Sequence, residues 1–271
     1  MHYNSRSIAL AAETVRAEAE AGTLRCVVVE SCPTRWKNTL KVQPAGSFLR
    51  GLFDNEMQAA AEVAEEFGCG VSLGDQAVED TGRRIAQLGG ATLVEALTPF
   101  AGGWGRIQRD LVAGWAQLDS PDGVSVSTLL EPRLLLATPL ALFRYPASIA
   151  FKSPALFSVL VGLGALTAGG SDTPLATDPA GLSLDLLQAA AFALLETLFL
   201  GRVFLVGLLE ERNYVLARNI RRAATAKPEE ANWAGASGTR SKAVKGRTVV
   251  AVLGMAHLNG VKQILTTSRV V

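Results

Sequence analysis

The feature that most constrains the fold of this chain is the stretch Thr248–His257, in which an apolar, β-branched run ends in Gly254-Met255-Ala256-His257. Such a run is typical of a buried strand, and it delivers a histidine into the turn at the strand's carboxyl end. In α/β proteins the carboxyl ends of parallel strands open into the crevice where sites are built. The chain has two histidines, His2 and His257. His257 is therefore the first candidate for a functional side chain.

The rest of the chain alternates helical and strand patterns. A helix is predicted from Ser5 to Gly22, and short buried strands are predicted over Leu24–Val29 and Gly70–Leu73. Further helices are predicted over 56–67, 78–88 and 183–224, with 43–55 as a linker. Acidic residues, Glu30 and Asp75, follow the first two strands. These patterns predict an α/β fold with a mixed β-sheet flanked by helices.

The length of the chain, 271 residues, suits a single domain with an elaboration. We divide it into an N-terminal α/β half (1–88), a large and mostly helical insertion (89–206), and a C-terminal helix and strand (207–271). Alanine, leucine and glycine dominate the insertion, and β-branched alternation is sparse there. The insertion is therefore expected to be helical, with breaks at its prolines and glycines.

Hydrophobic residues make up 49% of the chain, and the insertion holds much of this excess. The segment 153–171 carries no charge, but glycines and a proline interrupt it, and 186–201 contains Glu196. A membrane-spanning helix needs about 20 apolar residues without such breaks. Three interpretations remain open: a buried helical hairpin, which the interruptions favour, peripheral membrane contact through the apolar region 134–207, and a true span.

The balance of charge limits the classes of partner. There are 26 basic and 25 acidic residues, a formal net charge of +1, and no basic face or platform of aromatic and basic residues. A nucleic-acid partner is therefore not expected. The cysteines, Cys26, Cys32 and Cys69, have no metal-finger spacing, which favours reduced thiols. With no secretory leader at the start of the sequence, we expect an intracellular location such as a plastid or mitochondrion.

Several motifs, taken in order, resemble those of the TraB (pheromone-shutdown) family, which is related to the Tiki metalloproteases. The matching segments are His2-Tyr3-Asn4-Ser5 with Val27–Glu30, Asn55-Glu56-Met57 with Ala60, Asp75 with Thr81 and Arg84, Glu211-Arg212 with Ala217, and Gly254–Gly260. The last of these fits the family's closing Gly-x-x-His-Leu-x-Gly and is the most specific. The insertion is not matched in detail. The resemblance implies a TraB/Tiki-like architecture with its site at the strand tips.

The chain departs from the family pattern in three places. His2 is not preceded by Gly-Thr, so we expect that the family's first strand is missing from a truncated or mis-started chain. Gln76 stands where the family has arginine after Asp75, and Asn213 stands where it has aspartate after Glu211-Arg212. Both changes remove a charge, which predicts reduced or absent activity.

The resemblance implies a site for a divalent metal, namely Mn, Co or Zn. Imidazoles and carboxylates that leave a position open for water form a catalytic metal site, and the metal activates that water to attack an amide. The expected metal ligands are His257, His2, Glu30, Glu56 and Asp75. Glu211 is expected to be a ligand or general base, and Arg84 and Arg212 are expected to hold carboxylates or bind substrate.

Each of these residues also has a structural interpretation. A histidine after a strand is often a satisfied turn residue, and Glu56 suits a helix N-terminus, where its charge complements the helix dipole. Asp75 can be a turn former or an N-cap, and Glu211-Arg212 can be an exposed charge pair. Cys32 could be a nucleophile, but it would need one of the two histidines as its base.

Two functions follow from these patterns. The leading hypothesis is a metal-dependent hydrolase, similar to a peptidase, that acts on a short peptide or a protein terminus. The second is a non-catalytic regulatory or scaffold protein that sits at an organelle membrane through its apolar insertion. The feature that separates them is the completeness of the charged constellation at the strand tips.

Overall fold

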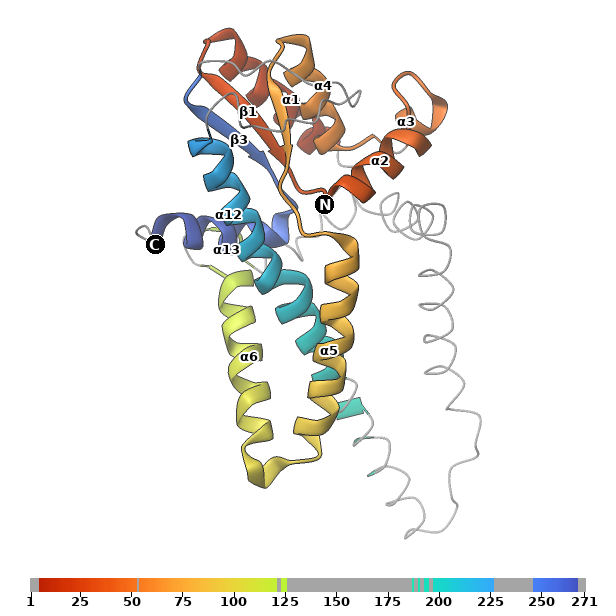
Figure 1. The fold of residues 1–271 in the computed structure, drawn as a ribbon, viewed down its shortest axis with the longest axis vertical. Coiled ribbons are helices and arrows are strands. Elements are labelled where there is room, and N and C mark those ends of the chain that lie inside the picture. The colour runs from red at the N-terminus through yellow and green to blue at the C-terminus, as the bar shows by residue number, and fades with distance from the viewer. Residues whose placement is uncertain are drawn as a thin grey trace.

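A computed structural model describes residues 5–52, 54–120, 123–125, 197–226 and 246–267, with isolated helical positions at 187, 190, 193 and 194. A small sheet and its covering helices form one end of the molecule, and a group of helices extends from it as an arm (Figure 1). The protein therefore belongs to the α/β class that the sequence predicts. His2 and the segment 153–171 lie outside the described residues.

Parallel strands form the sheet in the described part of the chain. Their order is β2 (Gly70–Leu73), β1 (Leu24–Val29), β3 (Thr248–Val252). A mixed sheet was predicted, whereas these strands are all parallel, because helical segments carry the chain back between them. β1 is central, and Val27–Val29 are fully buried. At its end Val29 pairs with both Leu73 and Val252, so the carboxyl ends of the strands share one edge.

Helices cover both faces of the sheet. On one face lie α1 (Ser5–Glu20) and α4 (Glu56–Glu66), and on the other lie α12 (Glu211–Thr225) and α13 (Met255–Thr267). Val15 and Ala60 belong to the first core, together with residues of β1. Leu216 and Val261 belong to the second core, where they pack with Val28. The sheet is thus buried on both sides, as parallel strands require.

The segment 43–55, predicted as a linker, contains a helix. α2 (Pro33–Val42) starts with proline at a position where the missing N–H costs nothing, and α3 (Phe48–Leu52) follows it. Arg50 of α3 donates to both carboxylate oxygens of Glu62, at 3.1 and 3.0 Å, and also pairs with Asp54. The linker prediction was wrong here because a contact with α4, and not local periodicity, holds this short helix.

The arm consists of helices that pack closely through glycine. Its elements are α5 (Val78–Ala96), the turn η1 (Pro99–Ala101), α6 (Gly103–Leu118), and the π-helix η2 (Val203–Glu210), which continues into α12. α5 extends beyond Leu88, where the sequence pattern ends it. Gly102 closes the turn with a φ of +77°, which glycine adopts without strain. Gly114 of α6 lies directly against Leu205 of η2.

No helix in the described part of the chain is both long and apolar enough to cross a membrane. The segment 153–171, for which the sequence leaves a span open, is not among those residues, and neither is most of 134–207. The described end of that region packs within the arm, where Leu205 and Val206 are buried.

Replacing Gly114 with alanine should loosen the arm. A Cβ at this position would lie 2.7 Å from Leu205 Cβ and 2.9 Å from the Leu205 carbonyl oxygen, so the helices would have to shift apart. We expect Gly114→Ala to lower the free energy of unfolding by about 1–3 kcal/mol in urea denaturation. Gly105→Ala on the same helix is the matched control, because nothing lies within 4 Å of its Cβ. It should raise stability by about 0.5–1 kcal/mol, and equal effects of the two variants would contradict the close packing.

Candidate functional site

A cluster of polar side chains lies at the carboxyl edge of the sheet. Glu30 directly follows β1, Asp75 lies shortly after β2, and His257 lies in the first turn of α13, just beyond β3. Arg212, near the start of α12, reaches the same edge. The structure therefore brings together Glu30, Asp75, Arg212 and His257, all predicted site residues, and we call them the edge cluster.

Glu30 is bonded at both carboxylate oxygens. Its Oε1 accepts a hydrogen bond from Arg212 Nη2 at 2.7 Å and lies 3.3 Å from His257 Nε2. Its Oε2 accepts the backbone N–H of Gly254, in the turn after β3, at 2.6 Å. Burial alone would raise the pKa of this carboxyl group, but the contact with His257, the charge of Arg212 and the Gly254 N–H hold the pKa well below its usual range. The buried carboxylate is therefore ionised at neutral pH.

Asp75 is held by two arginines. Its Oδ1 accepts the Gln76 backbone N–H at 2.7 Å and Arg212 Nε at 3.0 Å, and its Oδ2 pairs with Nη2 of both Arg212 and Arg35. Burial opposes the charge of Asp75, but the bonds and charge of Arg212, with the charge of Arg35, lower its pKa. The sequence analysis did not predict Arg35 as a site residue. The one sequence feature that could have indicated it is its position in a helix that starts just after Glu30.

His257 is oriented by a chain of buried amides. Its Nδ1 lies 2.6 Å from Asn213 Oδ1, and Asn213 Nδ2 donates to Gln117 Oε1 at 2.8 Å. Gly260 makes room for this chain, since a Cβ there would lie 2.1 Å from Asn213 Nδ2. The glycine that closes the Gly-x-x-His-Leu-x-Gly segment thus has a steric role. Asn213, noted in the sequence only as a departure, is part of the site, and Gln117 was missed.

The remaining predicted site residues are Arg84, Glu211, Glu56 and His2. Arg84 and Glu211 form their own partly exposed ion pair, with Arg84 Nε 2.7 and 3.0 Å from the Glu211 carboxylate oxygens. Glu211 therefore faces α5, whereas Arg212, the next residue, faces the edge of the sheet. Glu56 is the buried first residue of α4. His2 lies outside the described residues, so its role as a metal ligand, like that of Glu56, stays a prediction.

The cysteines are buried, free thiols. Cys32 Sγ accepts a hydrogen bond from Arg35 Nε at 3.4 Å. Burial raises the pKa of Cys26 to about 12, so this thiol is unreactive at neutral pH. Both ring nitrogens of His257 are already engaged, so this histidine is not placed as the base that a Cys32 nucleophile would need.

The edge cluster as it stands does not fit a metal ion. Every carboxylate oxygen of Glu30 and Asp75 accepts a hydrogen bond from a protein N–H group. The Arg212 guanidinium lies between the two carboxylates, in the place that a bridging cation would take, and Arg35 supplies a second positive charge. Among the described residues, no three histidine, cysteine, aspartate or glutamate side chains are grouped so that they could hold a metal. The Mn, Co or Zn site stays a prediction.

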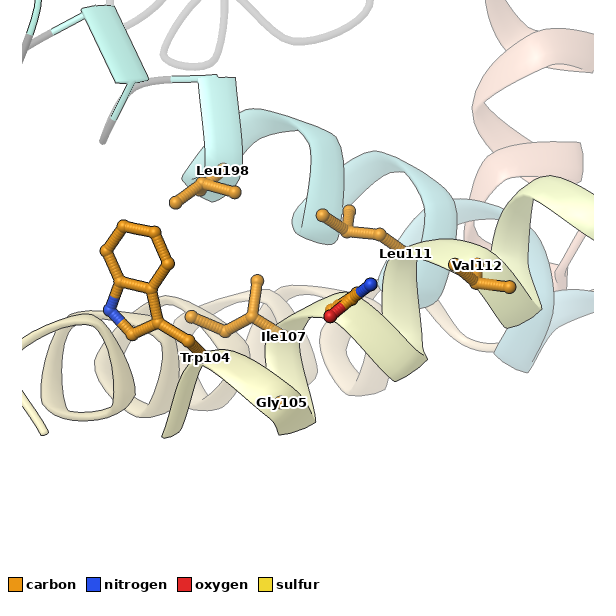
Figure 2. A pocket seen from close by; sticks show the side chains of 7 residues that line it. Trp104, Gly105, Ile107, Leu111, Val112 and Leu198 are labelled. Atoms are coloured by element: carbon orange, nitrogen blue, oxygen red, sulfur yellow. The ribbon is translucent and has the colours of Figure 1, made fainter. Parts of the chain in front are cut away.

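A cavity of about 320 Å³ lies in the arm, and none of the edge-cluster residues lines it (Figure 2). It is lined by Trp104, Gly105, Ile107, Gln108, Leu111, Val112 and Leu198. None of these side chains is charged, and Gln108 is the one amide among them. The lining suits a hydrocarbon group better than a peptide or an anion.

Comparisons with models of protein families, with curated proteins and with solved structures found no match to this chain. The resemblance to TraB proteins therefore remains a resemblance of short motifs. The geometry of the edge cluster and of the arm is therefore the evidence that bears on function.

Loss of Arg212 should destabilise the whole fold. Arg212→Met keeps a long side chain but leaves Glu30 and Asp75 buried without their shared cation. Because breaking a buried ion pair costs about 3–5 kcal/mol, we expect a loss of that size in the free energy of unfolding, measured by chemical denaturation. The control is Arg83→Met, since Arg83 is exposed and lies 3.7 Å from Asp80. It should cost less than about 0.5 kcal/mol, and an Arg212→Met variant as stable as this control would contradict the argument.

Stability should also fall in acid, because folding lowers the pKa of Glu30 and Asp75. A carboxyl group with a lowered pKa stabilises the fold above its unfolded pKa, about 4, and this contribution is lost as the pH falls toward the folded pKa. We expect the free energy of unfolding, measured by urea denaturation at each pH, to drop progressively below about pH 5. Asp75→Asn should be less stable at neutral pH and show a shallower drop in acid. A curve parallel to that of the wild type would show that Asp75 does not contribute.

Proposed function

We propose that this chain is a non-catalytic regulatory or scaffold protein with a TraB/Tiki-like architecture. The observation that carries the proposal is the closed bonding of the edge cluster. The carboxylate oxygens of Glu30 and Asp75 and the ring nitrogens of His257 are all engaged by protein groups. These residues are only 8%, 6% and 5% exposed. A catalytic acid, base or ligand needs an atom directed at its substrate, and this arrangement leaves none so directed.

The contacts of the cluster support a structural role. Arg212 ties the ends of β1 and β2 to α12, and Glu30 ties that arrangement to the turn after β3 through Gly254. Because η2 continues directly into α12, the same contacts fix the direction of the arm relative to the sheet. The pair Arg84–Glu211 adds a link between α5 and α12. A protein built this way presents a rigid arm to a partner.

Peripheral contact with an organelle membrane is part of the proposal. In the described end of the region 134–207, Leu200 and Phe204 are 45% and 48% exposed. Large apolar side chains gathered on an outer surface are typical of faces that bind a partner protein or a lipid surface. An intracellular location in a plastid or mitochondrion stays an expectation from the sequence.

A metal-dependent hydrolase that acts on a peptide or a protein terminus is the second candidate. The observation that favours it is the convergence of Glu30, Asp75, Arg212 and His257 at the carboxyl edge of parallel strands, where α/β enzymes place their sites. The described residues do not fit a metal in their present arrangement. This function would therefore require the Arg212 guanidinium to leave its place between the carboxylates.

Calorimetric titration with Mn²⁺, Co²⁺ and Zn²⁺ separates the two candidates. The wild type is compared with His257→Ala and with Asp80→Ala, an exposed carboxylate that serves as the matched control. The scaffold proposal predicts no stoichiometric binding that depends on His257. Stoichiometric binding that persists in Asp80→Ala and disappears in His257→Ala would overturn it in favour of the hydrolase. Thermal melting of each variant distinguishes a lost site from a lost fold.

A further inference from the structure

The outer half of the arm reverses the usual distribution of polar and apolar side chains. Arg202, 5% exposed, lies inside the arm, donates to Asp110 Oδ2 at 2.9 Å and Thr92 Oγ1 at 3.3 Å, and pairs with Glu95. Arg106 donates to the other carboxylate oxygen of Glu95 at 2.8 Å. Glu95 and Asp110, the acidic groups of this part of the arm among the described residues, are thus both ion-paired.

The outer surface of the same part of the arm is apolar. Large hydrophobic side chains are exposed at the end of α5, in η1 and at the start of α6, namely Leu93, Val94, Leu97, Phe100 and Trp104. Val112 and Trp115 are exposed farther along α6, toward the sheet. Leu97 is 80% exposed, and Phe100 is fully exposed. The turn between α5 and α6 lies at the end of the arm farthest from the sheet (Figure 1). We call the segment Leu97–Trp104 the arm tip.

Charge changes along the arm from the sheet toward the tip. Beyond Arg84, the one charged residue of α5 is Glu95, which is 15% exposed and paired. On α6 the first charged residues after the tip are Arg106 and Arg109, and Arg109 is exposed, with its Nε donating to the Gly105 carbonyl. The charge displayed just behind the arm tip is therefore positive.

This order of groups matches the depth profile of a lipid interface, in which hydrocarbon is followed by an aromatic belt and then by anionic headgroups. The Trp104 indole N–H donates to the Ala96 carbonyl at 2.9 Å. The half-exposed ring can therefore enter a lipid phase without leaving its N–H group unbonded. We propose that the arm tip inserts shallowly into the boundary between headgroups and acyl chains of an anionic bilayer. The inference rests on the proposed scaffold function and identifies an anionic bilayer as the partner of the scaffold.

The cavity of the arm supports a lipid as the occupant. Trp104, at the arm tip, and Leu198 both line it and come from two facing helical segments (Figure 2). Its lining offers hydrocarbon contact almost throughout, which an acyl chain fills without leaving a polar group unbonded. A peptide backbone would bring amide groups that this lining cannot satisfy.

Vesicle flotation of the full chain tests the proposal. The vesicles are equimolar phosphatidylcholine and phosphatidylserine, with pure phosphatidylcholine for comparison. We expect binding to the anionic vesicles and a blue shift of tryptophan emission, which Trp104→Phe reduces. Because burial of one exposed leucine or phenylalanine changes partitioning about ten- to hundredfold, the double variant Leu97→Ser/Phe100→Ser should bind at least about a hundredfold more weakly. Arg109→Gln should weaken binding to anionic vesicles about fivefold and leave binding to neutral vesicles unchanged.

Phe48→Ser is the matched control, because Phe48 is 82% exposed but lies on α3, away from the arm. It should bind as the wild type does. The proposal is overturned if the wild type does not float with anionic vesicles, or if the double variant floats equally well. It is also overturned if the double substitution changes only the oligomeric state in gel filtration, since the tip would then bind a second copy of the chain. The metal titration tests the non-catalytic assignment independently of these results, so failure of the membrane inference and failure of that assignment are distinguishable.

Discussion

The fold depends on one buried guanidinium group, that of Arg212, which lies between the carboxylates of Glu30 and Asp75. Burying a charge is unfavourable unless hydrogen bonds and an opposite charge compensate for it. Here the two carboxylates and the guanidinium compensate one another's charge. Water cannot replace these contacts, because the Asp75 side chain has no exposed surface and the Glu30 side chain has very little. The ends of β1 and β2 and the start of α12 are therefore fixed relative to one another. The position of the arm follows from them, since η2 and α12 are continuous.

The hydrogen bonds of the edge cluster also bear on function. A site that acts on a substrate keeps some donor or acceptor atoms available to it, whereas the carboxylate oxygens of Glu30 and Asp75 all accept hydrogen bonds from the protein itself. Asn213 illustrates the point, since it bonds both His257 and Gln117 and is completely buried. The residues of the edge cluster thus form a closed polar network with Asn213 and Gln117. Such a network rigidifies the part of the fold that contains it.

The arm follows the opposite rule from the sheet. Around β1 the interior is apolar, whereas the outer half of the arm has ion pairs centred on Arg202 inside and large apolar side chains outside. Glycines such as Gly114 let its helices approach closely without a large hydrophobic interior. A water-exposed surface gains nothing from Leu97 and Phe100, so their exposure is the feature of the arm that most needs a partner to explain it.

The sequence alone determined the strands and the edge of the sheet at which polar side chains gather. Leu24–Val29 and Gly70–Leu73 were predicted with the bounds that the structure has, because short apolar runs and the turns that end them are local signals. The grouping of Glu30, Asp75 and His257 was predicted because each follows the carboxyl end of a predicted strand, and the parallel pairing of the strands in the structure brings those ends together.

Tertiary structure alone decided what those residues do. It turned Arg212 toward the sheet and Glu211 toward Arg84, recruited Arg35 and Gln117, and formed α3 where a linker was predicted. It also turned Arg202 and Glu95 of the arm inward. Each of these outcomes rests on an ion pair or hydrogen bond between segments far apart in the chain. Such contacts have no periodicity, so their geometry exists only once the helices have packed against the sheet and against one another.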